Sequence, residues 1–179
     1  TLITSSAASD VYKRQQAHKA AMQFVAPNMN EQSLEAFYLY KFAEKGSRFP
    51  AYTPIVAGGE HACILHYVEN DQTLNDGDLV LVDAGGEYEC YASDITRTYP
   101  VNGKFSDEQL AVYKVVLEAH KQAIEAVKTG NHIMQPQEIS ERVITEGLVD
   151  LGILDGKTED LLEEGCLLYT SDAADDVIS

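Results

Sequence analysis

The sequence predicts an α+β domain in which an antiparallel sheet is flanked by helices. Two helical patterns precede a stretch of short β-branched and aromatic runs over residues 47–105, and two further helical patterns follow it. Helices and strands that are segregated along the chain, without regular alternation, are typical of this class. Hydrophobic side chains make up 45% of the 179 residues, which is enough to build a core.

Two helices are predicted before the sheet. Residues 16–25 predict the end of a first helix, because Pro27 follows it. Asn30 can cap a second helix over residues 31–45, which Gly46 ends. The apolar face of this second helix repeats at helical spacing through Leu34, Phe37, Tyr38 and Phe42.

Four short runs rich in β-branched and aromatic side chains predict antiparallel strands. They cover residues 55–57, 63–67, 79–82 and 91–99. Residues 75–78, with the sequence Asn-Asp-Gly-Asp, predict a turn before the third strand. A further turn near Tyr88–Glu89 would pair the last two strands in a hairpin.

Two more helices are predicted after the sheet. Ser106 and Gln109 form a capping-box pattern that opens a helix extending to about Lys128. We expect its buried face to consist of Leu110, Tyr113, Leu117, Ile124 and Val127. A last helix over residues 137–150 would turn inward Ile139, Val143 and Leu148.

Two carboxylates in the predicted hairpin are the candidate chemical site. Asp83 and Asp94 lie symmetrically about the expected turn, and their odd separation predicts that they face each other directly. Two buried carboxylates repel, and a hard divalent cation with oxygen ligands relieves the repulsion. The spacing alone leaves a second interpretation open, in which the turn is offset and both acids are solvated strand ends.

Charge and composition exclude several function classes. The net charge of −16 argues against binding to nucleic acids or to anionic membrane surfaces. The chain has no apolar run long enough to cross a membrane and no visible signal peptide. Three cysteines do not make a disulfide framework. We therefore expect a cytoplasmic protein without nucleic-acid or membrane partners.

The two ends of the chain have a different origin from the rest. When residues 5–15 are back-translated, the reverse complement of a suitable coding string encodes residues 166–175 without a mismatch. One inverted DNA element, similar to an adapter used in sequencing libraries, explains both. We therefore predict that residues 1–15 and 166–179 are artefacts, and that residues 16–165 are the N-terminal part of a catalytic domain.

Long ordered motifs in the central segment carry a family resemblance. They are residues 63–70 (Cys-Ile-Leu-His-Tyr-Val-Glu-Asn), 78–85 (Asp-Leu-Val-Leu-Val-Asp-Ala-Gly) and 93–105 (Ser-Asp-Ile-Thr-Arg-Thr-Tyr-Pro-Val-Asn-Gly-Lys-Phe). With these motifs the chain closely resembles the pita-bread metallopeptidases, and within them the Xaa-Pro aminopeptidases (aminopeptidase P). The resemblance covers essentially all of residues 16–165 and implies part of a pita-bread fold.

The resemblance also implies a dinuclear site, most often of manganese, with five ligands. Asp83 matches a ligand of one ion and Asp94 matches the ligand that bridges both, while a histidine and two glutamates come later in the family's chain. His66 matches a histidine that contacts the substrate near the scissile bond, and Tyr52 matches a tyrosine that lines the site. Thr96 shares the face of Asp94 and could orient its carboxylate.

The activity that the resemblance implies is release of an N-terminal residue from a peptide with proline in second position. The chain contains two of the five ligands, so we expect it to be inactive alone. Relatives are often homo-oligomers, so the resemblance also implies a homo-oligomer for the full-length protein. Two alternatives stay open: an Xaa-Pro dipeptidase, and a non-catalytic module of the same fold that binds peptides or proteins. Retention of both Asp83 and Asp94 favours an enzyme.

Overall fold

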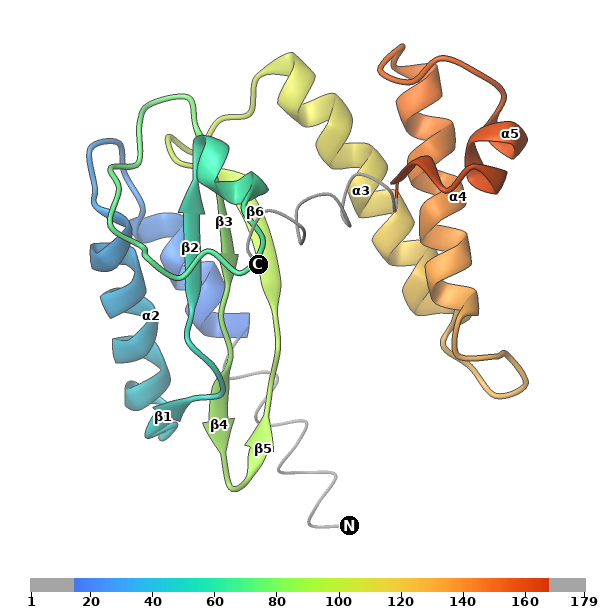
Figure 1. Cartoon of the computed structure of the whole chain (residues 1–179). Helices are drawn as coiled ribbons and strands as arrows, with labels where there is room; N and C mark the ends of the chain where they lie inside the picture. Colours follow the sequence, from blue (N-terminus) through green and yellow to red (C-terminus); the bar gives the residue numbers. More distant parts are fainter. Residues whose placement is uncertain (1–14, 168–179) are drawn as a thin grey trace. The chain divides into compact units, whose positions relative to one another are not determined.

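The computed structural model describes residues 15–167, in two compact units, Thr1–Phe105 and Ser106–Ser179 (Figure 1). Apart from the residues at their inner edges, the two segments predicted to be adapter-derived lie outside the described residues. Their origin therefore stays a prediction. The arrangement of helices and antiparallel strands within the described residues confirms the α+β class.

Two helices open the first unit, at residues 15–24 and at α2 (Glu31–Glu44). Asn30 caps α2, and its side-chain oxygen accepts a hydrogen bond from the backbone N–H of Gln32 at 2.8 Å. Gly46 follows the helix with a φ of 89°, a conformation that glycine adopts without a steric penalty. Both helical predictions for this part of the chain are confirmed.

The main sheet of the first unit has three antiparallel strands in the order β2-β3-β6. Their bounds are Ile55–Gly58 for β2, Leu79–Asp83 for β3 and Thr96–Pro100 for β6. A smaller sheet in the order β1-β4-β5 has bounds Phe49–Pro50, Gly86–Tyr88 and Tyr91–Ala92. Strands β3, β4, β5 and β6 make up one long hairpin, which we call the 79–100 hairpin (Figure 1).

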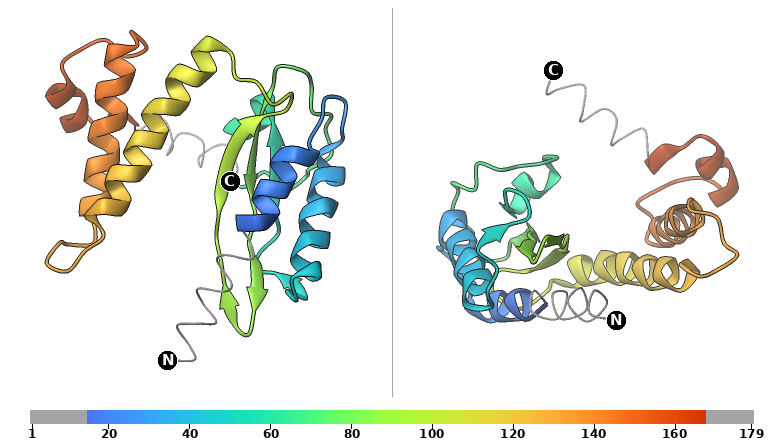
Figure 2. Two further views of the ribbon diagram at one scale, coloured as in Figure 1. Left: turned by 180° about the vertical axis from the view of Figure 1, so that it is seen from behind. Right: turned by 90° about the horizontal axis from the view of Figure 1, so that it is seen from below.

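The two helices cover one face of the main sheet (Figure 2). The core between them is formed by Ala17, Ala21, Leu34, Tyr38, Phe42, Val56, Val80, Val82 and Tyr99. On the opposite face Ile55, Ala57 and Tyr67 pack with Leu81 in a smaller cluster. Successive strand residues point to opposite faces, so Asp83 shares this second face with Leu81.

The segment between β2 and β3 differs from the prediction. Residues 63–67 are not a strand: the chain forms the 3-10 helix η1 (Gly59–Cys63) and then an irregular stretch. The reason is backbone geometry, since His66 has a φ of 53°, which no β-strand accommodates. We call residues 59–72 the 59–72 loop.

The second unit consists of three helices, α3 (Asp107–Ala126), α4 (Gln135–Asp150) and α5 (Thr158–Glu163). The predicted capping box is present, with the Ser106 and Gln109 side chains each accepting from the other's backbone N–H. The short helix α5 was not predicted.

The face predicted to be buried on α3 is only partly so. Leu110, Tyr113 and Leu117 are half-buried. Ile124 and Val127 are 58% and 73% exposed among the described residues, so the prediction was wrong for both. The last turn of α3 has no described apolar neighbour that covers them.

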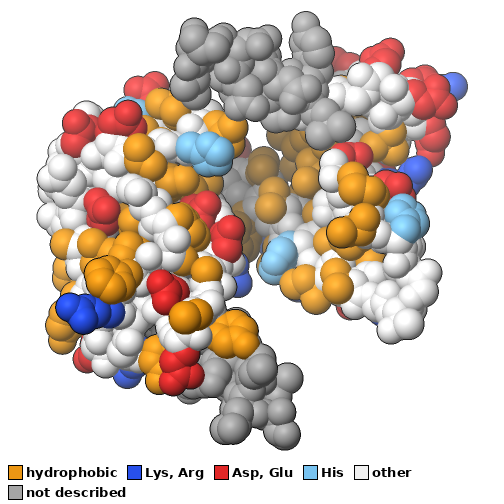
Figure 3. Space-filling view, turned by 60° about the horizontal axis from the view of Figure 1, so that its bottom comes forward, with side chains coloured by type: hydrophobic (Ala, Val, Ile, Leu, Met, Phe, Trp, Pro, Cys, Tyr) orange, Lys and Arg blue, Asp and Glu red, His pale blue; other side chains and the backbone are white. Residues whose placement is uncertain are grey.

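Acidic side chains are spread over the visible surface and mixed with hydrophobic ones, with few basic ones between them (Figure 3). This distribution agrees with the net charge of −16. No helix in residues 15–167 combines the length and the apolar character that crossing a membrane requires.

Candidate metal centre

The 79–100 hairpin carries both candidate carboxylates. Asp83, the last residue of β3, pairs with Thr96, the first residue of β6. The same register continues to the tip, because Ala84 N–H donates to Ile95 O at 3.2 Å and Ser93 N–H donates to Gly86 O at 3.3 Å. Asp94 therefore lies across from Gly85, two residues from the position opposite Asp83.

This register corrects the prediction that Asp83 and Asp94 face each other directly. The tip is formed by Glu89 and Cys90, with φ values of 50° and 67°, one residue later than the turn expected at Tyr88–Glu89. A shift of the turn by one residue moves the opposing partner by two positions. An even shift preserves the face, so both carboxylates still project from the same side of the hairpin.

The Tyr52 hydroxyl lies close to an oxygen of each of the two carboxylates. Tyr52 lies between β1 and β2, and its hydroxyl donates to Asp83 Oδ1 and also lies 3.2 Å from Asp94 Oδ1. A hydroxyl has one proton and can donate to only one of them at a time. Burial of the ring, followed by the hydrogen bond to Asp83, raises the pKa of the Tyr52 phenol above its usual range.

Gly85 makes this convergence possible. A Cβ atom on Gly85 would lie 1.7 Å from the carbonyl oxygen of Ser93 and 3.2 Å from Cε1 of Tyr52. The Gly85 carbonyl oxygen in turn accepts a hydrogen bond from Ala51 N–H at 2.9 Å, which fixes the segment that carries Tyr52. Only glycine fits here, between the two aspartates.

The donor set suits a hard divalent cation. Two carboxylates that converge on one hydroxyl offer the oxygen ligands that Mg²⁺ and Mn²⁺ prefer. Within residues 15–167 no group of three or more His, Cys, Asp or Glu side chains could hold a metal ion. Asp83 and Asp94 are therefore a pair of candidate ligands within the described residues.

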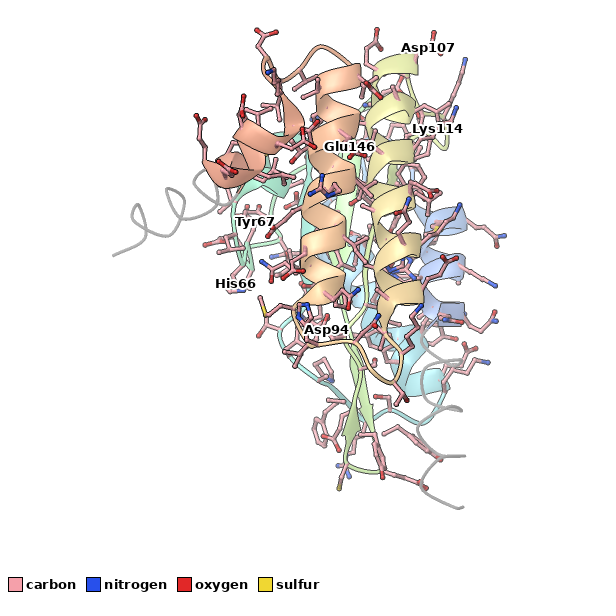
Figure 4. All side chains as sticks on the ribbon, turned by 90° about the vertical axis from the view of Figure 1, so that its right-hand side faces the viewer. His66, Tyr67, Asp94, Asp107, Lys114 and Glu146 are labelled. Carbon is pink, nitrogen blue, oxygen red and sulfur yellow. The ribbon has the colours of Figure 1, made fainter. Side chains whose placement is uncertain are left out.

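His66 lies on the 59–72 loop, next to the buried Tyr67 (Figure 4). Its own side chain is exposed. Tyr67 packs on the second face of the main sheet with Ile55 and Ala57, the face from which Asp83 projects. The loop therefore brings His66 to the same side of the sheet as the carboxylates.

Three residues with close contacts in the first unit were not singled out as site residues from the sequence. Gly85 was quoted only as the last residue of the motif over residues 78–85. Glu31 is an acid in the first turn of a capped helix, which is common on any helix. Asn70 was quoted only as the last residue of the motif over residues 63–70, and no local pattern marks its contacts.

The second unit holds a groove of about 840 Å³ between its three helices. Lys114 and Glu146 both line it (Figure 4). None of the candidate site residues does.

Comparison with known families gives a match over most of the chain. Residues 12–166 match the family described as metallopeptidase family M24. The chain is 54% identical over 147 residues to the Xaa-Pro aminopeptidase of Haemophilus influenzae and 45% identical over 148 residues to that of Escherichia coli. These alignments cover 82% and 83% of this chain but 34% of each relative, so the chain spans about a third of their length.

Solved structures are similar over a comparable stretch. Aminopeptidase PepP of Pseudomonas aeruginosa has a TM-score of 0.89 and 46% sequence identity, over 91% of this chain and 37% of that one. Zinc-substituted aminopeptidase P of E. coli in complex with product has a TM-score of 0.88 and 40% identity, with the same two coverages. The α+β arrangement is thus that of part of the pita-bread fold.

Proposed function

Since the chain belongs to metallopeptidase family M24, we propose that the protein is a metal-dependent aminopeptidase that releases an N-terminal residue when proline follows it. The observation that carries this proposal is the convergence of Asp83 and Asp94 on the Tyr52 hydroxyl. The curated relatives named Xaa-Pro aminopeptidases support the choice of substrate.

Asp83 and Asp94 would help to hold two divalent ions through their carboxylate oxygens. We propose manganese among the divalent ions that such oxygen donors suit. When bound, such ions would supply a hydroxide nucleophile at neutral pH and stabilise the oxyanion of the attacked carbonyl. Thr96, directly across the hairpin from Asp83, would help to orient the carboxylates through its hydroxyl.

The substrate would be bound by His66 and Tyr52. An exposed histidine on the second face of the sheet can hydrogen-bond a peptide and move a proton near neutral pH. The Tyr52 hydroxyl would donate a hydrogen bond to a carboxylate oxygen of Asp83 or of Asp94, and so hold that oxygen in place. An Xaa-Pro bond has no N–H to grip, so such contacts must come from the carbonyl side.

The proposal extends to compartment and assembly. Cys63 and Cys90, the two cysteines within residues 16–165, are exposed free thiols, as suits the reducing cytoplasm. We propose a homo-oligomer that acts on proline-containing peptides, without nucleic-acid or membrane partners. The 179-residue chain alone would be inactive, because the described residues provide only Asp83 and Asp94 as ligands.

The test is peptide cleavage by the full-length gene product with Mn²⁺. We expect cleavage of an Xaa-Pro-Yaa tripeptide, and its loss in Asp94→Ala. Asp155→Ala, the same substitution at an exposed position of the second unit, should keep full activity. Undiminished activity of Asp94→Ala would falsify the proposal. Cleavage confined to an Xaa-Pro dipeptide would indicate the dipeptidase, and metal-independent peptide binding without cleavage would indicate the non-catalytic module.

A further inference from the structure

Glu31 is a buried carboxylate that the proposed chemistry does not use. It is the first residue of α2 and its side chain is 1% exposed. Three groups donate hydrogen bonds to it: Gly58 N–H to Oε1 at 2.8 Å, the Tyr67 hydroxyl to Oε2 at 2.8 Å and Gln72 N–H to Oε2 at 3.0 Å. His61 Nδ1 lies 3.7 Å from Oε1. A buried carboxylate is stable only with such partners, so its position is closely specified.

The partners of Glu31 belong to two different parts of the first unit. Gly58 ends β2, which is the edge strand of the main sheet. Tyr67 and Gln72 belong to the 59–72 loop, and His61 to η1. A single side chain of α2 thus ties the helix to the sheet edge and to both ends of the loop.

The 59–72 loop needs such a tie because its backbone is strained. His66 and Asn70 have φ values of 53° and 48°, in the left-handed region that non-glycine residues rarely adopt. Strained residues of this kind persist where surrounding contacts over-determine them. Next to His66, the Tyr67 ring stacks on His61 with centroids 5.0 Å apart, and the Tyr67 hydroxyl is held by Glu31.

The far end of the loop is held separately. The Asn70 side chain accepts from Val56 N–H at 2.8 Å and donates to Pro54 O at 2.9 Å and to Glu35 Oε2 at 3.1 Å. Glu35 lies one turn along α2 from Glu31. It contacts the loop through one hydrogen bond, whereas Glu31 accepts two from the loop and one from Gly58 in β2.

We propose that Glu31 is a positioning residue for His66, acting through Tyr67 and the 59–72 loop. The inference rests on the proposed function for the role of His66. Glu31 itself does not contact the substrate. Its carboxylate holds the loop so that the exposed imidazole is presented on the carboxylate face of the sheet in one orientation.

Glu31→Gln tests the claim with almost no change in side-chain volume. An amide has one oxygen, so either the Gly58 N–H or the Tyr67 hydroxyl together with the Gln72 N–H loses its acceptor. Glu35→Gln is the matched control: it removes the same charge from the same helix, while the amide oxygen still accepts from Asn70. Tyr67→Phe is the second variant, which removes one hydrogen bond and keeps the stacked ring, should Glu31→Gln fail to fold.

The first readout is amide hydrogen exchange, which does not depend on activity. We expect exchange over residues 64–68 to rise at least about tenfold in Glu31→Gln and to stay near the wild-type rate in Glu35→Gln. Exchange across β3 and β6 should not change in either variant. Unchanged exchange at residues 64–68 in both Glu31→Gln and Tyr67→Phe overturns the inference, whether or not the protein is active.

The second readout is kinetic and uses the full-length gene product with Mn²⁺ and an Xaa-Pro-Yaa peptide. We expect Glu31→Gln to lower kcat about tenfold, and to cause no further loss when it is added to His66→Ala. A merely structural role would lower activity equally in both backgrounds, and that result overturns the inference. So does full activity of His66→Ala, which leaves nothing to position. Absence of activity in the wild type rejects the proposed function instead, and hydrogen exchange then decides on Glu31.

Discussion

The 79–100 hairpin and the 59–72 loop bring candidate site residues to the same face of the sheet by different means. The hairpin places Asp83 and Asp94 through a continuous backbone register from β3 to its tip. The loop has no backbone ladder and is held by the side chains of Glu31 and Asn70. One half of the site therefore depends on strand geometry, and the other half on a few polar side chains.

The largest expected effect comes from breaking the hairpin at Gly85. In Gly85→Ala the new Cβ meets the Ser93 carbonyl oxygen at 1.7 Å, and backbone cannot move aside as a side chain can. We expect a loss of at least about 4 kcal/mol in the free energy of unfolding, measured by urea denaturation. Gly103→Ala is the control: its φ is 76° but its Cβ meets no atom within 4 Å, so it should cost only about 1 kcal/mol. Equal losses in the two variants would contradict the close approach.

The next effect concerns the loop. Asn70→Ala removes three hydrogen bonds, leaves the buried Val56 N–H without an acceptor and keeps the left-handed backbone. We expect destabilisation of about 3 kcal/mol by thermal or urea unfolding. Asn102→Ala, which removes two exposed hydrogen bonds, one to Asp76 and one from Lys104 N–H, should change stability by less than about 1 kcal/mol. A small effect at Asn70 would mean that the loop is not held by its side chains.

A third prediction asks whether the hairpin also depends on a side chain. His18 is buried beneath it, with Nε2 3.2 Å from Ala84 O and Nδ1 3.0 Å from the Tyr38 hydroxyl. Burial lowers the pKa of His18 from 6.5 to about 4. Between these values the unfolded chain binds a proton that the folded chain does not, so stability is full above pH 6.5 and falls as the pH approaches 4.

At pH 5 this linkage amounts to about 2 kcal/mol relative to pH 7. The measurement is urea unfolding at both pH values. His18→Gln should remove this part of the difference, and His120→Gln, on an exposed face of α3, should not. If His18→Gln keeps the full pH dependence, another group is responsible.

The smallest expected effect is a gain in the stability of the folded protein. Glu89 and Cys90 both adopt positive φ at the hairpin tip, where Asn and Gly are preferred in two-residue turns. The double substitution Glu89→Asn with Cys90→Gly should stabilise the protein by about 1 kcal/mol in urea unfolding. Cys90→Ser removes the thiol and keeps the strain, so it should give no gain.

The different supports of hairpin and loop explain what the sequence could predict. The continuous apolar run before Asp83 and the odd spacing to Asp94 were enough to place both on one face. The exact opposition was wrong because two non-glycine residues, Glu89 and Cys90, form the tip in an unfavourable conformation that composition does not reveal.

The loop shows the opposite outcome. Residues 63–67 are rich in apolar and aromatic side chains and were predicted as a strand, yet the left-handed backbone at His66 interrupts them. The neighbouring Tyr67 hydroxyl donates to Glu31, more than thirty residues earlier in the chain. Contacts between residues so far apart in the sequence leave no local periodicity, so a prediction from sequence patterns does not detect them.

The two exposed free thiols lie in these two regions. Cys63 ends η1 at the start of the irregular part of the loop, and Cys90 lies at the hairpin tip. With Cys166 replaced by serine, spin labels attached to Cys63 and Cys90 would allow the distance between the loop and the hairpin to be measured. The width of the measured distance distribution would then report, in a protein without engineered labelling sites, how tightly the loop is held against the hairpin.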